Sequence, residues 1–361
     1  MNKAKQQTKA FEAKFNAMMG KTKESLTLSD AANHKYMDFV DPITGAPHLL
    51  FEWLFGCRGL PNGKLLQILG KQHCGKSSLL YYLYGMGLYN GAWIKHGETE
   101  QNALTPTRIK ALGANSDLVM LQNPNGFEAF KTGLLELAPS VKATDAEGLY
   151  PLVYGLDSAS NLGDSKVDYD TGARADTATP GAHARLFSAF FRDQTNSMKH
   201  NNLRLIVIGQ FKSKIGTMPG ESKQTTIAGN PIGFSAAWTL DLVKFKNKAT
   251  PDECDDILIK CTKNKMSRNT GTSVRVSLYK DDRGWDVDTA TARLLTTESY
   301  SPLKPGTFKT HGGRYYYEPF NDGKGLRAKD FMNEVYNNSK LLTDIRKAWD
   351  IVGYGGGDAK K

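Results

Sequence analysis

The sequence predicts an α/β fold in which helices cover a mainly parallel sheet. From Lys64 onward, short apolar segments that suit strands alternate with longer segments that suit helices, which is typical of a parallel sheet. A glycine-rich motif at 70–78 stands between the first of these strands and the helix after it. Three closely spaced strand-like segments, at 239–245, 256–264 and 273–279, are expected to pair in antiparallel fashion at one edge of the sheet.

The remaining elements follow in chain order. Residues 1–30 form a basic amphipathic stretch with a short strand candidate at 25–28, which has the character of an arm rather than of core. The other expected strands are 64–69, 91–97, 118–123, 151–158 and 203–210. One helix is expected to begin at Gly75, and three others are expected at 105–112, 126–137 and 181–199. A small helical segment is expected at 327–352.

Composition and charge favour a globular protein with a polyanionic partner. The chain has 361 residues, 40% of them hydrophobic, and its 47 Lys and Arg exceed its 37 Asp and Glu to give a net charge of +10. The four cysteines contain no CxxC pair, which argues against a disulfide framework or a structural metal site. Because no run of about 18 apolar residues occurs and the first residues lack the apolar core of a signal peptide, we expect a cytoplasmic protein without a membrane partner.

A phosphate-binding loop is the strongest motif in the sequence. Residues 70–77 fit G-x-x-x-x-G-K-[ST] and lie between a strand and a helix, as the motif requires. The two glycines allow backbone amides to point at phosphate oxygens, and the following helix places its positive end there. Lys76 is expected to reach the β- and γ-phosphates of ATP, and the Ser77 hydroxyl to bind Mg²⁺. The predicted ATP-binding residues are Gly70, Lys71, Gln72, His73, Cys74, Gly75, Lys76, Ser77 and Ser78.

Acidic and amide side chains follow three other predicted strands. Asp157 ends one of them and is expected to hold Mg²⁺ together with Ser77. Glu98 and Glu100 follow another strand to the same carboxyl edge of the sheet, and one of them is the candidate base that polarises the attacking water. Gln210 ends a third strand, where it is placed to sense a γ-phosphate.

Several ordered segments resemble one family. They are GLPNGKLLQILGKQHCGKSS around the loop, ALTPTRIKALG after the acidic pair, the GLDS strand, IGQFKSKIGTMPGESKQTTIAGN, CTKNKM and LRAKD. Together they cover about residues 50–345 and resemble the RecA recombinases, most closely their bacteriophage UvsX-like members. The resemblance implies a RecA-like P-loop ATPase core with a doubly wound sheet and helices on both faces. It also implies protomers that stack into a helical filament on single-stranded DNA, with ATP between neighbours.

The resemblance also divides the chain. It implies an N-terminal helix and polymerisation arm at 1–49, an ATPase core at 50–298, a small C-terminal domain at 299–352 and a flexible tail at 353–361. The tail lacks the acidic run found in bacterial RecA, so autoinhibition by the tail is not implied.

Catalytic roles are carried over by motif. Glu100 resembles the catalytic glutamate, although one extra residue after it leaves Glu98 and Gln101 as alternatives for that position. Lys263 and Lys265, in Lys-Asn-Lys, match the pair that reaches a neighbour's γ-phosphate across the filament interface. Such a contact would couple hydrolysis to assembly, because it neutralises transition-state charge only between assembled protomers.

Two segments, 161–180 and 211–229, are the predicted DNA-binding loops. Lysines of the second loop can neutralise phosphates, and its glycines let the backbone approach closely. The first loop carries four aspartates, so its contacts with DNA are not assumed. The predicted DNA-binding residues are Arg185, Arg192, Lys212, Lys214, Ile215, Met218, Gly229 and Asn230.

The implied function is ATP-dependent homologous recombination on single-stranded and double-stranded DNA. A single-strand DNA-binding protein and a loading mediator are expected partners, in the cytoplasm of a bacterial host if a bacteriophage encodes the chain. Two alternatives stay open, a hexameric DNA helicase on the same ATPase core and an ATP-dependent filament-forming regulator that does not act on DNA. The Lys-Asn-Lys segment in place of an arginine finger favours the recombinase over the helicase, and the basic excess favours it over the regulator.

Overall fold

The computed structural model describes residues 34–100, 104–142, 150–162, 182–213, 224–226, 230–297, 300–304 and 306–351. The chain divides into two units, 1–35 with 354–361 and 36–353, and the second unit contains the elements described below.

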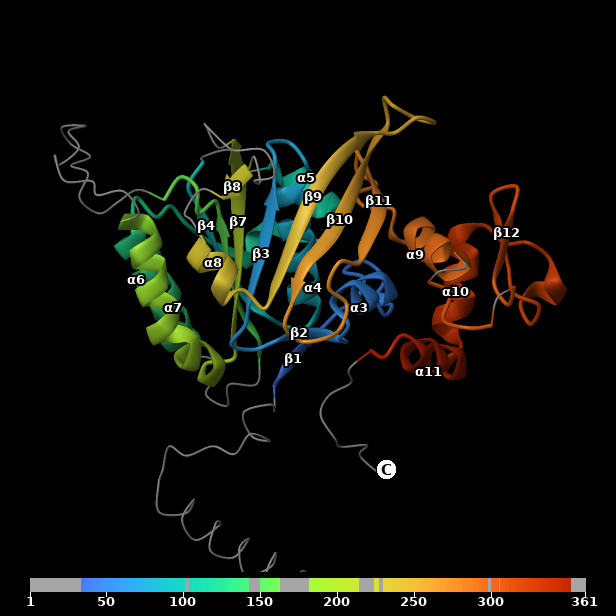
Figure 1. Ribbon diagram of the computed structural model, residues 1–361, viewed down its shortest axis with the longest axis horizontal. Coiled ribbons are helices and arrows are strands. Elements are labelled where there is room, and N and C mark those ends of the chain that lie inside the picture. The colour runs from blue at the N-terminus through green and yellow to red at the C-terminus, as the bar shows by residue number, and fades with distance from the viewer. Residues whose placement is uncertain are drawn as a thin grey trace, which may run out of the picture. The chain divides into compact units, whose positions relative to one another are not determined.

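A mixed, mainly parallel sheet forms the centre of this unit (Figure 1). Its strands are β3 (Leu65–Gly70), β4 (Trp93–Glu98), β5 (Val119–Gln122), β6 (Leu152–Asp157), β7 (Leu203–Ser213), β8 (Gln224–Thr226), β9 (Trp238–Lys246), β10 (Cys254–Asn264) and β11 (Ser273–Tyr279). The order is β11-β10-β9-β3-β7-β6-β4-β5, with β8 paired to β7 off this path. Neighbours from β9 to β5 run parallel, whereas β10 pairs antiparallel with both β9 and β11. The predicted α/β fold and its antiparallel edge are therefore confirmed.

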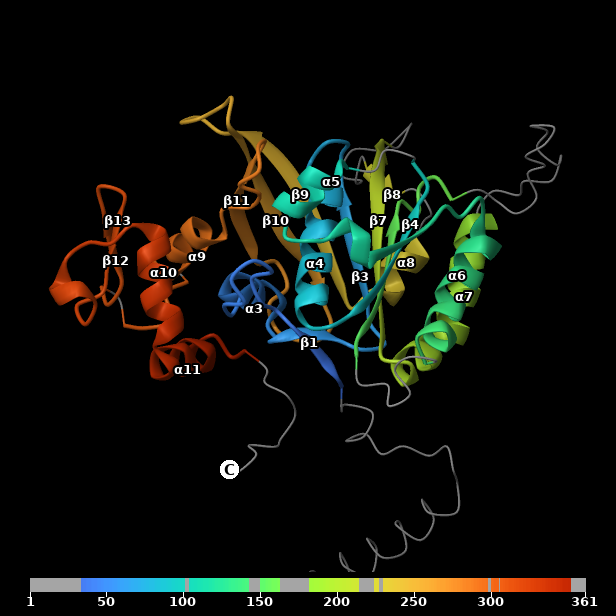
Figure 2. The same ribbon diagram turned by 180° about the vertical axis from the view of Figure 1, so that it is seen from behind.

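Helices cover both faces of the sheet, as Figures 1 and 2 show from opposite sides. One face carries α3 (Leu49–Phe55), α4 (Lys76–Tyr89) and α5 (Pro106–Ala111), and the other carries α6 (Phe127–Lys142), α7 (Ala182–His200) and the short α8 (Asn230–Ser235). The α6 helix extends five residues beyond its expected end, and β7 extends three residues beyond its expected end to pair with β8.

Alternating side chains divide the core of the sheet into two layers. On β3, Leu66 and Ile68 pack into the layer under α4, while Leu65 packs into the layer under α6 and α7. Strand β7 alternates in the same way, with Ile206 on the first side and Val207 on the second. Apolar residues on both faces are what a parallel sheet buried on both sides requires.

The two helical layers differ in composition. Helices α6 and α7 contribute a cluster of five phenylalanines at helical spacing, in which Phe127 packs edge-on against Phe187 with ring centroids 5.0 Å apart. Helix α4 is buried around most of its circumference and brings Tyr81, Tyr82 and Tyr84 into the core. Because buried tyrosine hydroxyls need hydrogen-bond partners, these three residues impose polar contacts on an otherwise apolar layer.

Small elements flank the sheet. The β1 strand (Tyr36–Asp38) pairs with β2 (Gly59–Pro61), and α9 (Val287–Thr296) leads to the β12 (Lys309–His311) and β13 (Arg314–Tyr316) hairpin. None of these was expected from the sequence, whereas α10 (Ala328–Asn337) and α11 (Ser339–Ala348) confirm the helical C-terminal segment. Two short 3-10 helices, Ser116–Leu118 and Asn321–Gly323, complete the described elements.

Candidate nucleotide-binding site

The carboxyl ends of four parallel strands bring the predicted site residues together. Gly70 at the end of β3 is in register with Gln210 of β7, and Glu98 at the end of β4 is in register with Asp157 of β6. Residues from segments far apart in the sequence thus meet at one edge of the sheet, where ligands of parallel α/β folds bind.

The glycine-rich loop turns at this edge from β3 into α4. Gly75 caps the helix at φ 90°, in the left-handed region, and His73 also has positive φ at 56°. A Cβ on Gly70 would lie 2.8 Å from the Leu242 carbonyl oxygen and would overlap the Cys74 sulfur. Cys74 is buried against Gly70, so its thiol helps to pack the loop. The predicted loop-to-helix context of the motif is confirmed.

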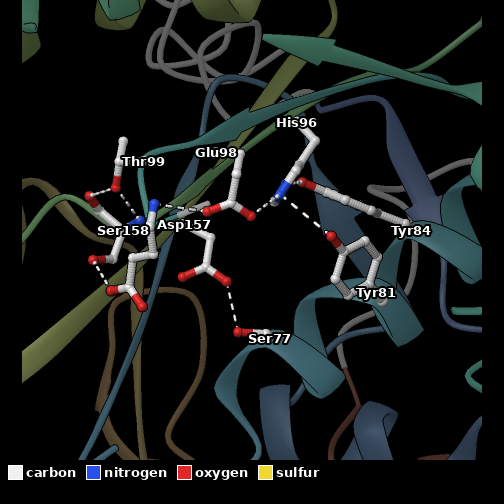
Figure 3. A network of polar contacts seen from close by, with 9 residues as sticks. Ser77, Tyr81, Tyr84, His96, Glu98, Thr99, Asp157 and Ser158 are labelled. Atoms are coloured by element: carbon white, nitrogen blue, oxygen red, sulfur yellow. Dashed lines mark hydrogen bonds and ion pairs between the residues drawn. The ribbon is translucent and has the colours of Figure 1, made fainter. Parts of the chain in front are cut away.

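The two predicted metal ligands are in direct contact. The Ser77 hydroxyl donates a hydrogen bond of 2.6 Å to Oδ2 of Asp157, as Figure 3 shows. Nearby, the buried Lys76 ammonium donates to the Lys71 carbonyl oxygen at 2.6 Å. No cluster of three or more His, Cys, Asp or Glu side chains suited to a metal occurs among the described residues. One hydroxyl and one carboxylate fit Mg²⁺, which commonly takes its remaining ligands from phosphate and water.

Burial changes the ionisation of the Asp157 carboxyl group. It raises the pKa of Asp157 to about 6, the bond from Ser77 opposes that shift, and the neighbouring Glu98 carboxylate adds to it. A cation at this place would stabilise the ionised carboxylate, so the site is suited to a metal-bound phosphate.

Glu100 and Gln210 also meet at this edge. Oε1 of Glu100 accepts hydrogen bonds of 2.8 Å from the Ser158 hydroxyl and from Nε2 of Gln210. Together with the loop they line a pocket of about 640 Å³. Its lining residues are Gln72, His73, Cys74, Gly75, Lys76, Ser77, Ser78, Glu100, Leu104, Asp157, Gln210 and Leu278.

Glu98 does not line this pocket, although it lies beside Asp157. It is buried, its Oε2 lies 3.3 Å from Nε2 of His96, and its Oε1 accepts a hydrogen bond of 2.7 Å from the Glu100 backbone N–H. Of the two glutamates, only Glu100 therefore lines the pocket. Gln101, the third alternative, lies outside the described residues.

The other predicted site residues lie away from the pocket or outside the residues that the structure describes. The side chains of Lys263 and Lys265 both donate to carbonyl oxygens at the end of α8, and Lys265 reaches Phe234 O at 2.7 Å. Arg185 and Arg192 are exposed on α7. Lys212 and Asn230 are described only in their backbone, and Lys214, Ile215, Met218 and Gly229 lie outside the described residues, as do the 1–30 arm and the 353–361 tail.

Two contacts from the antiparallel edge of the sheet were not predicted from the sequence, and neither was the place of Leu104 in the pocket lining. Leu278 on β11 lines the pocket, and Nε1 of Trp285 donates to the Ser78 carbonyl oxygen over 3.5 Å. Both come from the antiparallel edge, about 200 residues after the loop, and no local pattern marks them. Only the pairing order of β9, β10 and β11 places them there.

Comparison with known proteins agrees with this geometry. The sequence profile described as the RecA N-terminal domain matches residues 20–281. The chain belongs to the RecA family. It is 26% identical to Protein RecA of Xylella fastidiosa (strain 9a5c) over 308 residues, covering 84% of this chain and 82% of that protein. It is 30% identical to Protein RecA of Paracoccus denitrificans over 325 residues, covering 87% and 83% of the two chains.

Membership of the RecA family implies ATPase activity with ATP and Mg²⁺, which the Ser77–Asp157 pair and the glycine-rich loop fit. Among the described residues of this RecA-family chain, no helix has both the length and the apolar character needed to cross a membrane.

Proposed function

We propose that this RecA-family protein is an ATP-dependent homologous recombinase. It assembles as a helical filament on single-stranded DNA, pairs that strand with homologous duplex and exchanges the strands. The activity would serve recombination, repair and recombination-dependent replication in the cytoplasm.

The contact between Gln210 and Glu100 carries this proposal. Gln210 lies on β7, three residues before the strand ends at Ser213, and the second predicted DNA-binding loop follows in the sequence. Its amide donates to the Glu100 carboxylate over 2.8 Å. A shift of the loop on binding DNA would move Gln210 and, with it, the carboxylate proposed to act on water. This contact offers a direct physical route from DNA to ATP hydrolysis.

The residues of the pocket divide the chemistry between them. Lys76 and the loop amides would hold the phosphates, and Ser77 with Asp157 would hold Mg²⁺. Bound Mg²⁺ would draw charge from the β- and γ-phosphates and ease departure of the γ-phosphoryl group. Glu100, fixed through Oε1, would orient the attacking water and accept its proton.

Assembly would complete the site. We propose that Lys263 and Lys265 leave the carbonyl oxygens at the end of α8 and reach the γ-phosphate bound by a neighbouring subunit. Desolvation and the charge of Lys265 lower the pKa of Lys263 to about 8, and a phosphate partner would favour its charged form.

The same proposal includes the type of RecA-family recombinase and its partner proteins. We propose a bacteriophage type of recombinase from the resemblance of the quoted segments to UvsX-like proteins. The 26–30% identity to bacterial RecA proteins supports the RecA family and not this finer affiliation. Loading onto DNA would then involve a single-strand DNA-binding protein and a mediator, inside a bacterial host.

The test is ATP hydrolysis with and without single-stranded DNA, for wild type and the Lys263→Ala/Lys265→Ala double variant. We expect DNA to stimulate the wild type and to have little effect on the double variant, because the variant lacks the contact between subunits. Equal rates in all four samples would contradict the proposal. Electron microscopy of the same samples distinguishes open filaments on DNA from closed rings, which would indicate a helicase, and from filaments indifferent to DNA.

A further inference from the structure

A buried hydrogen-bond network connects the helix after the phosphate loop to the backbone of Glu100 (Figure 3). It begins at Tyr84 on α4, passes through His96 and Glu98 on β4, and ends at the Glu100 N–H. Helix α4 also carries Lys76 and Ser77, so the network joins the proposed phosphate and metal ligands to the proposed base.

Both ring nitrogens of His96 have hydrogen-bond partners. Nδ1 lies 2.9 Å from the Tyr84 hydroxyl, and Nε2 lies 3.3 Å from Oε2 of Glu98 and 3.4 Å from the Tyr81 hydroxyl. With its proton on Nε2 the ring accepts from Tyr84 and donates to Glu98, and with its proton on Nδ1 it donates to Tyr84. The ring is 2% exposed, so these partners replace water almost completely.

The sheet is shaped to admit this network. Gly155 on β6 leaves the space that the Tyr84 hydroxyl occupies, since a Cβ at this position would overlap that oxygen. Gly97 on β4 leaves room for Tyr154 instead, which packs in the other core layer and donates to Gln122. Of these two glycines, Gly155 is the one that makes room for the network.

Glu98 is fully engaged in this network. One carboxylate oxygen faces His96 and the other accepts the Glu100 N–H at 2.7 Å, while the whole residue is 6% exposed. The Glu100 side chain is fixed separately, by Ser158 and Gln210. Glu98 therefore holds the Glu100 N–H, while Ser158 holds both the Glu100 carboxylate and the preceding Thr99.

We propose that Glu98 and His96 are positioning residues, which hold the Glu100 backbone in a fixed place relative to the α4 helix while Glu100 alone acts on water. This inference rests on the proposed function and assigns different roles to the two glutamates. The physical reason is that hydrolysis needs the base, the phosphates and the metal in fixed relation, and a displacement of about 1 Å can cost about 100-fold in rate.

Substitution of Glu98 separates the two roles. In Glu98→Gln the amide oxygen still accepts the Glu100 N–H, and the amide N–H group faces Nε2 of His96, which accepts it when the ring carries its proton on Nδ1 and donates to the Tyr84 hydroxyl. The kcat of this variant should therefore stay within about threefold of wild type. In Glu98→Ala that acceptor is lost, and kcat should fall about 10- to 100-fold while the Kd for a fluorescent ATP analogue stays unchanged. If Glu98 were the base, Gln would be as inactive as Ala, and this result would overturn the proposal.

Tyrosine variants test the far end of the network. Tyr84→Phe removes the partner of His96 Nδ1 and should lower kcat by a smaller factor, again with an unchanged Kd. Tyr82→Phe is the matched control, because Tyr82 lies on the same helix but contacts Asp41 and His48 instead. An equal effect of both substitutions on kcat would show a general loss of helix packing and contradict the inference.

Amide hydrogen exchange provides a measurement that does not depend on activity. Glu98→Ala should accelerate exchange of the Glu100 N–H strongly, whereas Glu98→Gln should leave it close to wild type, because only the first variant removes the acceptor. Unchanged exchange in Glu98→Ala would overturn the positioning role. A wild-type protein that hydrolyses no ATP but shows the expected exchange pattern would overturn the proposed function and leave the positioning of Glu100 supported.

Discussion

The Ser77 hydroxyl donates a hydrogen bond to Oδ2 of Asp157 over 2.6 Å, across 80 residues of sequence. The contact joins the first turn of α4 to the end of β6, and each residue comes from a different βα connection. It orients both oxygens toward one place beside the phosphate loop, which is the arrangement that a shared cation needs.

Replacement of Asp157 by Asn tests this pair. The amide oxygen can still accept from Ser77 and carries no buried charge, so the melting temperature should not fall, but the negative charge that holds Mg²⁺ is lost. We expect ATP hydrolysis to fall by about 100-fold or more, since removal of one electrostatic partner typically has that effect. The exposed Glu128 on α6 offers a control of equal charge change, and Glu128→Gln should hydrolyse ATP like wild type. A fully active Asp157→Asn protein would exclude Asp157 as a metal ligand.

The raised pKa of Asp157 predicts how pH acts on the ligand-free protein. Burial raises this pKa to about 6 in the folded state, above that of the unfolded chain, so the native state binds the proton more tightly. The contribution to stability is therefore full below about pH 4 and is lost as the pH rises through 6. Denaturant unfolding of wild type and Asp157→Asn between pH 4 and 8 measures it, and parallel pH profiles would contradict the assignment.

The same titration should govern Mg²⁺ binding. Because the proton and the cation compete for the carboxylate, the apparent Mg²⁺ affinity in the presence of nucleotide should fall by about tenfold per pH unit below 6 and level off above it. Calorimetric titration at several pH values checks this expectation, and an affinity that does not vary between pH 5 and 7 would argue against Asp157.

A further prediction concerns stability far from the pocket. Both guanidinium Nε and Nη2 of Arg346 on α11 donate to the buried Glu52 carboxylate of α3, at 2.7 and 2.6 Å. Removing one partner leaves a buried charge unpaired, so Arg346→Ala should lower the free energy of unfolding by about 3–5 kcal/mol. The Glu52→Leu/Arg346→Leu double variant should recover most of this loss, as measured by denaturant unfolding. The control is Arg283→Ala, which breaks an exposed ion pair with Asp281 and should have a small effect.

Much of the site could be predicted because its signals are local in sequence. The motif of the glycine-rich loop predicts the geometry of the loop directly. Polar residues at the ends of apolar strands converge whenever those strands are parallel. Asp157, Glu100 and Gln210 could therefore be assigned to one edge before the strand order was known. The short elements α9 and the β12–β13 hairpin could not be predicted, because they are stabilised by packing against other segments more than by a hydrophobic pattern of their own.

The His96–Glu98 network marks the limit of the sequence reasoning. Helix α4 carries four tyrosines, and the local sequence does not indicate which of them faces β4, because that depends on how the helix packs on the sheet. Likewise, the choice between Glu98 and Glu100 depends on which side chain enters the pocket and which turns into the core. Both questions concern tertiary packing, which cannot be derived from the hydrophobic pattern of the sequence.

The last prediction concerns DNA. Arg185 and Arg192 lie seven residues apart on α7, where both side chains are exposed, and they would contact the phosphate backbone if α7 faces DNA. Each phosphate contact on a single strand contributes about 0.7 to the slope of log affinity against log salt concentration. The Arg185→Ala/Arg192→Ala double variant should therefore bind single-stranded DNA more weakly at low salt, with a slope smaller by about 1.4.

Nucleotide affinity of this double variant should stay at the wild-type value, because both arginines lie outside the pocket lining. Lys110→Ala/Lys347→Ala removes the same charge from exposed positions on α5 and α11 and serves as the control. Fluorescence anisotropy with a labelled oligonucleotide at several salt concentrations measures both slopes. If the two double variants lose the same slope, the effect reflects net charge alone and α7 is not a DNA-contacting surface. A loss confined to the arginine variant would place the DNA backbone along α7, beside the first predicted loop.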